Sequence, residues 1–434
     1  MKVKQSRWKM CVVAGAAMAF VAGMVSTVPN VYAGGTIKVD DDKWISVGMG
    51  TRTQFSMRED GSASGGASGG QWSNGFAVDN ARIYINGKVH KYVGFEFNTD
   101  CFNCAFGAGT SHNAGNSNIG LLDAIGKFEV NELVNVWFGR MLVPTERGEL
   151  NGPFYHAVYD GFRTPLNPAD FSRNFGAGGA GLYGRDNGVS FFGKIHPGGT
   201  HLQYVAGIFT GLQSASGAGP NQRDSLKYAG RLTWNLLNEE KNPGYYTSGT
   251  YYGTAGDILA IAVGGEYQNA GAGSFANKSD SGIFTSDLLF EKVLDNKGVI
   301  TVNAEYKRYW ANNLAAWGQA IPATATNFAA GTDCFCMFSG TSFTAYALYL
   351  FPNEVGIGRF QPYGRYTFVN SVHSTALDEF EGGVNYVIAG HNARISTWYR
   401  TGSLSTNGGI GGANPLNALG QHQDSFHVAL QLQY

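Results

Sequence analysis

The sequence has no apolar run long enough to form a membrane-spanning helix, which needs about 20 residues. Its main apolar run, residues 11–25, is shorter and lies near the N-terminus. Charge is also scarce: 15% of residues are charged, and 31 basic against 32 acidic residues give a net charge of −1. Proline is rare, with 12 residues, whereas glycine is frequent, with 62. These features exclude a helical membrane protein and a nucleic-acid binder, and they favour many flexible turns.

The N-terminus has the three parts of an export signal. Basic residues precede the apolar run: Lys2, Lys4, Arg7 and Lys9. Val31-Tyr32-Ala33, directly before Gly34, fits a small-residue cleavage site. We therefore predict that residues 1–33 are a removable signal peptide; the alternative is an N-terminal membrane anchor. Cleavage would remove four basic residues and no acidic one, so the mature chain, residues 34–434, is net acidic.

The remaining chain alternates apolar and polar residues, which is the period of a β-strand with one apolar face. In ITVNAEYK, residues 300–307, the apolar side chains of Ile300, Val302, Ala304 and Tyr306 share one face. About 400 residues exceed one ordinary soluble core, and no linker divides the chain. We therefore expect an all-β protein that forms one large barrel.

Sixteen segments show this alternation. They are residues 43–57, 79–89, 92–99, 119–129, 134–143, 188–196, 200–210, 225–235, 257–268, 282–292, 298–309, 342–351, 358–369, 376–387, 392–402 and 424–434. The connections are alternately long and short, which is typical of a transmembrane antiparallel β-barrel with short periplasmic turns and long external loops. Two connections break the rule: 236–256 is too long and 370–375 too short, so strands could be missed or merged there.

The last segment, DSFHVALQLQY, predicts the strand that closes the barrel. Phe426, Val428, Leu430 and Leu432 would face outer-membrane lipid, and Tyr434 would lie at the membrane interface. Closure against the first strand removes the exposed edges that a lipid environment cannot tolerate. The predicted location is therefore the outer membrane of a Gram-negative cell.

Several of these segments resemble the phosphate-selective porin O and P family. They are DNARIYINGKVHKYVGFEFN (79–98), VNVWFGRMLVPTERGEL (134–150), LKYAGRLTWN (226–235), FEGGVNYVIAGHNARI (380–395) and the terminal FHVALQLQY. The resemblance implies a sixteen-stranded homotrimeric porin whose last strand is presented to the barrel-assembly machinery. It also implies that Arg82, Arg140, Arg163 and Arg231 lie on the lumen wall or an inward loop. Because the mature chain is net acidic, the fold and porin activity carry over, and phosphate specificity does not.

The connection at residues 144–187 is long enough to be functional, and it is rich in aromatic and charged residues. By analogy with porins, we expect this loop to fold inward and narrow the lumen; the alternative is a lid outside the barrel. Its constriction residues would be Arg147, Arg163, Arg173 and Arg185, which would select solutes by charge and width.

Strand parity assigns further charges to the lumen wall. The predicted basic residues are Arg82, Lys88, Lys227, Arg231, Lys307, Arg365, Arg394 and Arg400. The acidic residues opposite them are Glu96, Glu266, Asp287, Glu305 and Glu381. These charges either guide solutes or only hydrate the lumen and pair with one another.

Four cysteines remain in the mature chain, in CFNC (Cys101, Cys104) and CFC (Cys334, Cys336), and all four are expected in external loops. Disulfides are possible in an exported protein, in any of three pairings. The sequence has no haem-attachment motif and no paired-histidine metal spacing, so we predict no cofactor and no metal.

Together these features predict a passive diffusion channel for small hydrophilic solutes, with anions such as phosphate favoured by the arginines, and no enzymatic activity. One alternative is a barrel sheath around a multihaem cytochrome, which would need a lumen without an inward loop. A less favoured alternative is an outer-membrane hydrolase whose nucleophile and histidine meet only in space.

Overall fold

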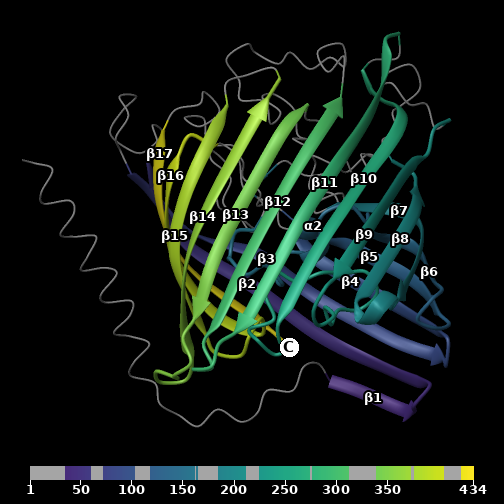
Figure 1. The fold of residues 1–434 in the computed structure, drawn as a ribbon, viewed down its shortest axis with the longest axis horizontal. Coiled ribbons are helices and arrows are strands. Elements are labelled where there is room, and N and C mark those ends of the chain that lie inside the picture. Colours follow the sequence, from purple (N-terminus) through teal and green to yellow (C-terminus); the bar gives the residue numbers. More distant parts are fainter. Residues whose placement is uncertain are drawn as a thin grey trace, which may run out of the picture.

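The computed structural model describes residues 35–59, 72–102, 118–161, 163–164, 184–211, 224–273, 276–311, 339–372, 376–404 and 422–434. Within these ranges the chain forms one antiparallel sheet of 17 strands, drawn in Figure 1. The elements are β1 (Gly35–Asp40), β2 (Lys43–Glu59), β3 (Trp72–His90), β4 (Val93–Phe102), β5 (Asn118–Glu129), β6 (Asn135–Leu142), α2 (Arg147–Asn151), β7 (Arg185–Ile195), η2 (Pro197–Gly199), β8 (His201–Phe209), β9 (Lys227–Asn235), β10 (Ile258–Gly273), β11 (Lys278–Val293), β12 (Val299–Ala311), β13 (Gly340–Leu350), β14 (Arg359–Ser371), β15 (Leu377–Val387), β16 (Ala393–Gly402) and β17 (Gln423–Gln433).

Strands β2 to β17 close into a barrel, because each pairs with the next in sequence and β17 returns to β2. Leu432 lies opposite Thr51, and the last residue exchanges two backbone hydrogen bonds with Met49: Tyr434 N donates to Met49 O at 2.7 Å, and Met49 N donates to Tyr434 O at 2.9 Å. The predicted fold class and the closing role of the last segment are confirmed.

The inner face of the barrel is polar, because the polar residues that alternate with the apolar ones along each strand point into the lumen. In β12, Thr301, Glu305 and Lys307 are buried within the barrel, whereas Tyr306 is 37% exposed on the outer face. All sixteen predicted segments coincide with β2 to β17. Searched over the same described ranges, the structure contains no helix that is long and apolar enough to cross a membrane.

The sequence did not predict β1. Strand β17 ends opposite Gly50, so it does not pair with the first residues of β2. Strand β1 pairs there, with Ile37 opposite Ile45. It has only six residues, so its alternation of Ile37 and Val39 with Thr36, Lys38 and Asp40 is too short to identify a strand. Ile37 and Val39 are 71% and 81% exposed.

Neither irregular connection separates strands that fail to pair. Strand β14 ends at Ser371 and β15 begins at Leu377, and the two are antiparallel neighbours with Val369 opposite Leu377, so the short connection joins adjacent strands. Residues 236–257, between β9 and β10, contain no strand, although they lie between strands on the side of short turns. The suggestion of missing strands is therefore wrong, and the long connection has a different explanation, given below.

Residues 143–161, which include α2, and residues 163 and 164 lie inside the barrel. Figure 1 labels α2 in front of or behind the strands of the wall, and the hydrogen bonds of this segment reach strands that are far apart around the barrel. Arg147 bonds Asp287 on β11, whereas the Phe154 carbonyl accepts a hydrogen bond from Gln431 on β17. The expected inward fold of this loop is confirmed for the residues that the structure describes. We call residues 143–161 together with 163 and 164 the inner loop.

Candidate functional site

Polar side chains of the wall hold the backbone of the inner loop. Arg394 Nη1 donates to the carbonyls of His156 at 2.9 Å and Ala157 at 3.0 Å. Arg365 Nη1 donates to the Asp160 carbonyl at 2.5 Å. An irregular segment inside a barrel must satisfy its backbone polar groups on the wall, because buried carbonyls without partners are costly. These two predicted wall arginines therefore position the loop.

Arg147 lies at the centre of a buried ion network. Its guanidinium makes two 2.7 Å hydrogen bonds to the Glu240 carboxylate and one of 3.0 Å to Asp287, and it is 1% exposed. Asp287 also accepts hydrogen bonds from Arg231, at 2.5 and 2.8 Å. Two predicted arginines thus share one carboxylate, and Arg147 is enclosed by its partners.

A second network holds the far end of the inner loop. Arg163 bonds Glu379 through both Nε, at 3.0 Å, and Nη2. Asp160 accepts from Arg400 Nη2 at 2.9 Å and lies 3.6 Å from Arg163. Burial favours protonation of Asp160, but the nearby guanidinium groups, Arg400 foremost, outweigh burial and hold its pKa below the ordinary value. Asp160 is therefore a carboxylate at neutral pH.

Most of the other predicted basic residues also pair with carboxylates. The pairs are Arg82–Asp100 (2.7 Å), Arg185–Asp123 (3.0 Å), Lys227–Asp186 (3.0 Å), Lys307–Glu305 (3.4 Å), Arg365–Glu381 (2.6 Å) and Arg400–Glu381 (2.7 Å). Arg185 belongs to the first residues of β7, and Arg173 lies outside the described residues. Lys88 and Arg394 have no carboxylate partner within the described ranges. The lumen wall is thus largely charge-balanced.

Residues 236–257 form a second segment inside the lumen, which we call the inner turn. Tyr245 Oη donates to the Leu142 carbonyl at 2.8 Å, and Gly249 N donates to the Tyr155 carbonyl at 2.8 Å. The Tyr245 ring packs 5.2 Å from the ring of Trp137 on β6. Sequence reasoning missed this role, and the only signal was the length of the segment on the short-turn side.

A buried carboxylate anchors the end of the inner turn. Glu291 on β11 accepts hydrogen bonds from Thr250 Oγ1 at 2.7 Å, Tyr251 N at 3.0 Å and Gly253 N at 2.7 Å. The inner turn is therefore held by the wall as well as by the inner loop, and the two segments meet in the lumen.

Two serine–histidine pairs lie within hydrogen-bond distance. Ser425 Oγ lies 3.0 Å from His427 Nε2, whose ring Nδ1 faces Gln54, and Ser248 Oγ lies 3.1 Å from His391 Nε2. The Ser248 hydroxyl also donates to the Thr250 carbonyl at 2.9 Å. Burial, and next the neighbouring Arg394, lower the pKa of His391 to about 3. Since no carboxylate binds this imidazole in the described part of the chain, the pair lacks the orienting group of a hydrolase triad.

The cysteine and metal predictions are tested only in part of the chain. Cys101, at the end of β4, is disulfide-bonded. Cys104, Cys334 and Cys336 lie outside the described residues, so the pairing stays a prediction. Where the chain is described, no group of three or more His, Cys, Asp or Glu side chains is placed to hold a metal ion.

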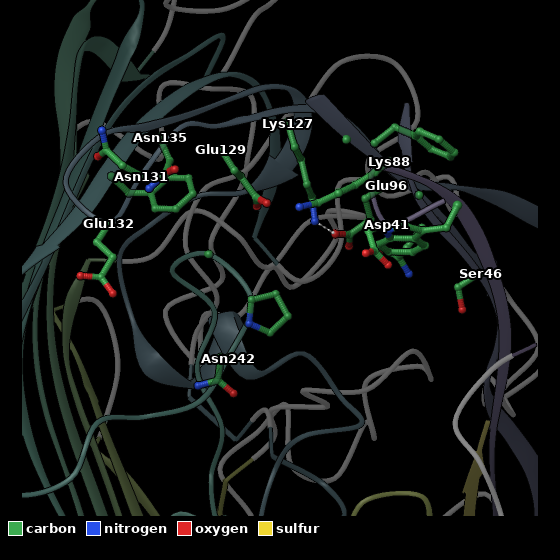
Figure 2. A pocket seen from close by; sticks show the side chains of 18 of the residues that line it. Asp41, Ser46, Lys88, Glu96, Lys127, Glu129, Asn131, Glu132, Asn135 and Asn242 are labelled. Atoms are coloured by element: carbon green, nitrogen blue, oxygen red, sulfur yellow. Dashed lines mark hydrogen bonds and ion pairs between the residues drawn. The ribbon is translucent and has the colours of Figure 1, made fainter. Parts of the chain in front are cut away.

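Part of the lumen is open. A cavity of about 900 Å³ is lined by residues of β1 to β7 and by residues 239–244 of the inner turn. Figure 2 shows Lys127 and Glu129 pointing from the wall into the open space and Asn242 across from them. Because Trp44 and Ser46 also line it, the cavity lies at the barrel end where β17 terminates. We call this cavity the vestibule.

No protein-family profile matches the sequence, and no curated protein matches it. Among solved structures, the chain is similar to the anion-selective porin from Comamonas acidovorans, with 12% identity, coverage of 90% of this chain and 99% of that chain, and a TM-score of 0.52. It is also similar to a loop L8 deletion mutant of OmpT from Vibrio cholerae (12% identity, 91% and 100% coverage, TM-score 0.49) and to Salmonella typhi OmpF in complex with daunomycin (11%, 92% and 100%, 0.49). At 12% identity, the similarity to the Comamonas acidovorans porin shows the fold alone. The chain therefore has the fold of a porin-like outer-membrane β-barrel.

Proposed function

We propose that this protein is an outer-membrane porin, a passive diffusion channel for small hydrophilic solutes. The observation that carries the proposal is the open vestibule inside a closed barrel with a polar lumen. The inner loop and the inner turn occupy much of the lumen and contact β2, β3 and β6 as well as β11, β16 and β17. Solutes would enter through the vestibule beside residues 239–244. Both segments would act as constrictions.

The proposal includes the route to the membrane and the assembly. Residues 1–33 would direct export and be removed. The closing strand with its terminal Tyr434 would be the segment that the barrel-assembly machinery binds, and the mature barrel would form a homotrimer as the phosphate-selective porin O and P family does. The half-exposed ring of Tyr434 is available for such recognition.

We propose only a modest preference for anions such as phosphate. It would come chiefly from Arg394, a buried cation that binds loop carbonyls and has no carboxylate partner in the part of the chain that is described. Arg147, Arg163 and Arg185 would fix the width of the passage, since their charges are balanced by bound carboxylates. Pairing of this kind removes the long-range field that a ring of free arginines would create.

The alternative of a cytochrome sheath is disfavoured by the inner segments. A sheath needs a lumen that a partner can fill, whereas here the inner loop and the inner turn occupy that space and bond to the wall. A hydrolase is disfavoured because, in the described part of the chain, no carboxylate bonds the imidazole of the Ser248–His391 pair or of the Ser425–His427 pair, and His391 is a very weak base.

The test is the reversal potential of the purified mature protein in a planar bilayer under a potassium chloride gradient. We expect a steady conductance with a small reversal potential of the sign that anion preference gives. Arg394→Met should move that potential toward cation preference, whereas Arg365→Met should move it less, because loss of Arg365 removes one of the two cations bound to Glu381 and leaves the other. Cation preference in the wild type would refute the anion proposal, and no conductance from a correctly folded barrel would refute the channel.

A further inference from the structure

The vestibule is lined by almost equal numbers of positively and negatively charged side chains. Four lysines and five carboxylates face it: Lys38, Lys88, Lys127, Lys194, Asp41, Glu96, Glu129, Glu132 and Glu239. A cavity with this balance does not favour solutes of one charge sign. Its specificity must therefore come from where the unpaired charges lie.

Three of the lysines are paired. Lys127 binds Glu96, Lys194 binds Glu239, and Lys38 lies 2.5 Å from Asp41. Glu132 is mostly exposed and lies 3.4 Å from His196.

Lys88 and Glu129 are different. Across the described ranges neither has an ion-pair partner, although both are half-buried and line the vestibule. Glu129 Oε1 accepts one hydrogen bond, from Trp137 Nε1 at 3.2 Å, which leaves the second carboxylate oxygen for another donor. Among the half-buried charges of the vestibule, these two therefore have no ion-pair partner in the described part of the chain. A half-buried charge without a partner is costly, so each favours a solute group of opposite charge.

Strand register fixes the distance between these two charges. Lys88 on β3 lies opposite Gly94 on β4, and Gly94 lies opposite Lys127 on β5, two residues before Glu129. With about 4.8 Å between strands and about 3.4 Å per residue, the backbones of Lys88 and Glu129 are about 12 Å apart. Gly94, between them, adds no side chain to this gap. The two charged ends of a short peptide can span such a gap, since an extended chain covers about 3.5 Å per residue.

We propose that the vestibule binds small zwitterionic solutes of the di- and tripeptide class, with Lys88 binding the carboxylate and Glu129 the ammonium group. Three asparagines of the lining, Asn86, Asn135 and Asn242, supply amides for the peptide groups in between. A cavity of about 900 Å³ is of the size that encloses such a molecule. The inference rests on the proposed channel only for how the solute reaches this site.

The experiment is titration calorimetry of the purified full barrel in detergent with triglycine. Three capped forms isolate the two charges: N-acetyl-triglycine, triglycine amide and the doubly capped peptide. We expect triglycine to bind about tenfold more tightly than the doubly capped peptide. In Lys88→Met, amidation of the carboxylate should no longer weaken binding; in Glu129→Gln, acetylation of the amine should no longer weaken it. Lys91→Met, in the exposed turn between β3 and β4, is the matched control and should bind as wild type.

Equal affinity for triglycine and the doubly capped peptide, or no binding of either by wild-type barrel, would overturn the inference. Variants are compared only if they keep the heat-modifiable gel mobility of the folded barrel, and Lys88→Arg provides a second, charge-preserving variant that should retain binding. Because calorimetry in detergent needs no ion flow, a conducting barrel that binds no peptide rejects this inference alone. Peptide binding without conductance rejects the channel and keeps the site.

Discussion

The substitution Arg147→Met tests whether ion pairing holds the inner turn in the lumen. Arg147 belongs to the inner loop, Glu240 to the inner turn and Asp287 to the wall, so this one guanidinium joins three parts of the structure. Methionine keeps much of the side-chain volume and removes every charged contact. Glu240 would then remain buried, at 8% exposed, without a cation.

The cost follows from the partners that stay behind. Breaking a buried ion pair by removing one member costs about 3–5 kcal/mol. The low end applies here, because Tyr251 Oη still donates to Glu240 at 2.9 Å and Arg231 still binds Asp287. About 3 kcal/mol corresponds to about a hundredfold shift in a local opening equilibrium. The inner turn should therefore leave the lumen about a hundred times more often than in the wild type.

Hydrogen exchange of the Gly249 amide measures this opening, because that amide donates to the Tyr155 carbonyl of the inner loop. We expect its exchange to be about a hundredfold faster in Arg147→Met. Arg185→Met is the matched control: it breaks a buried pair with Asp123 that joins two wall strands and should leave Gly249 unchanged. Equal Gly249 exchange in wild type and Arg147→Met would refute the reasoning.

Three further outcomes are expected. Gly244→Ala should lower the thermal unfolding midpoint, measured by heat-modifiable gel mobility, because an added Cβ would lie 2.2 Å from the Trp137 ring. Gly198 has a similar positive φ but open space around it, so Gly198→Ala should lower the midpoint less. Because the pKa of Asp160 is depressed, its contribution to stability is complete above the ordinary carboxyl pKa of about 3.9 and is lost as the pH falls below that value. Conductance noise of the wild type should therefore rise in acid, and that of Asp160→Asn should already be raised at pH 7. Tyr434→Ala should lower the amount of assembled barrel in outer-membrane fractions on an immunoblot but not the yield of refolding in detergent; equal amounts in cells would contradict a recognition role.

The barrel wall could be predicted because lipid imposes its pattern on the sequence. Where a strand crosses the membrane, its outward residues must be apolar, and the period of two is then visible in a single sequence. Agreement is close for β16, predicted at 392–402 and observed at Ala393–Gly402. It is poorer for β3, predicted from residue 79 and observed from Trp72. Residues 72–78 were not recognised as strand because their alternation is weaker.

The interior could be predicted only in outline. Parity identified the arginines that face the lumen, but their partners are distant in sequence. Arg147 is separated from Glu240 by 93 positions and from Asp287 by 140. The inner turn was visible only as a connection of unusual length, because its contacts with the inner loop leave no local period. Lys88 was predicted on the wall, whereas Glu129 was not singled out, since its role depends on which neighbours already have partners.

The pairing of the lumen charges links the shape of the passage to its electrostatics. Arg163, Arg365 and Arg400 bind Glu379 and Glu381, and all three also contact Asp160 of the inner loop. A substitution that frees one of these charges therefore also loosens the loop that sets the width of the passage, because a buried network is stable only when all of its members are satisfied. Counting arginines consequently cannot predict ion selectivity in this barrel. Selectivity must be sought at lumen charges without an ion-pair partner. Among the residues described, such charges include Arg394 beside the inner loop and, in the vestibule, Lys88 and Glu129.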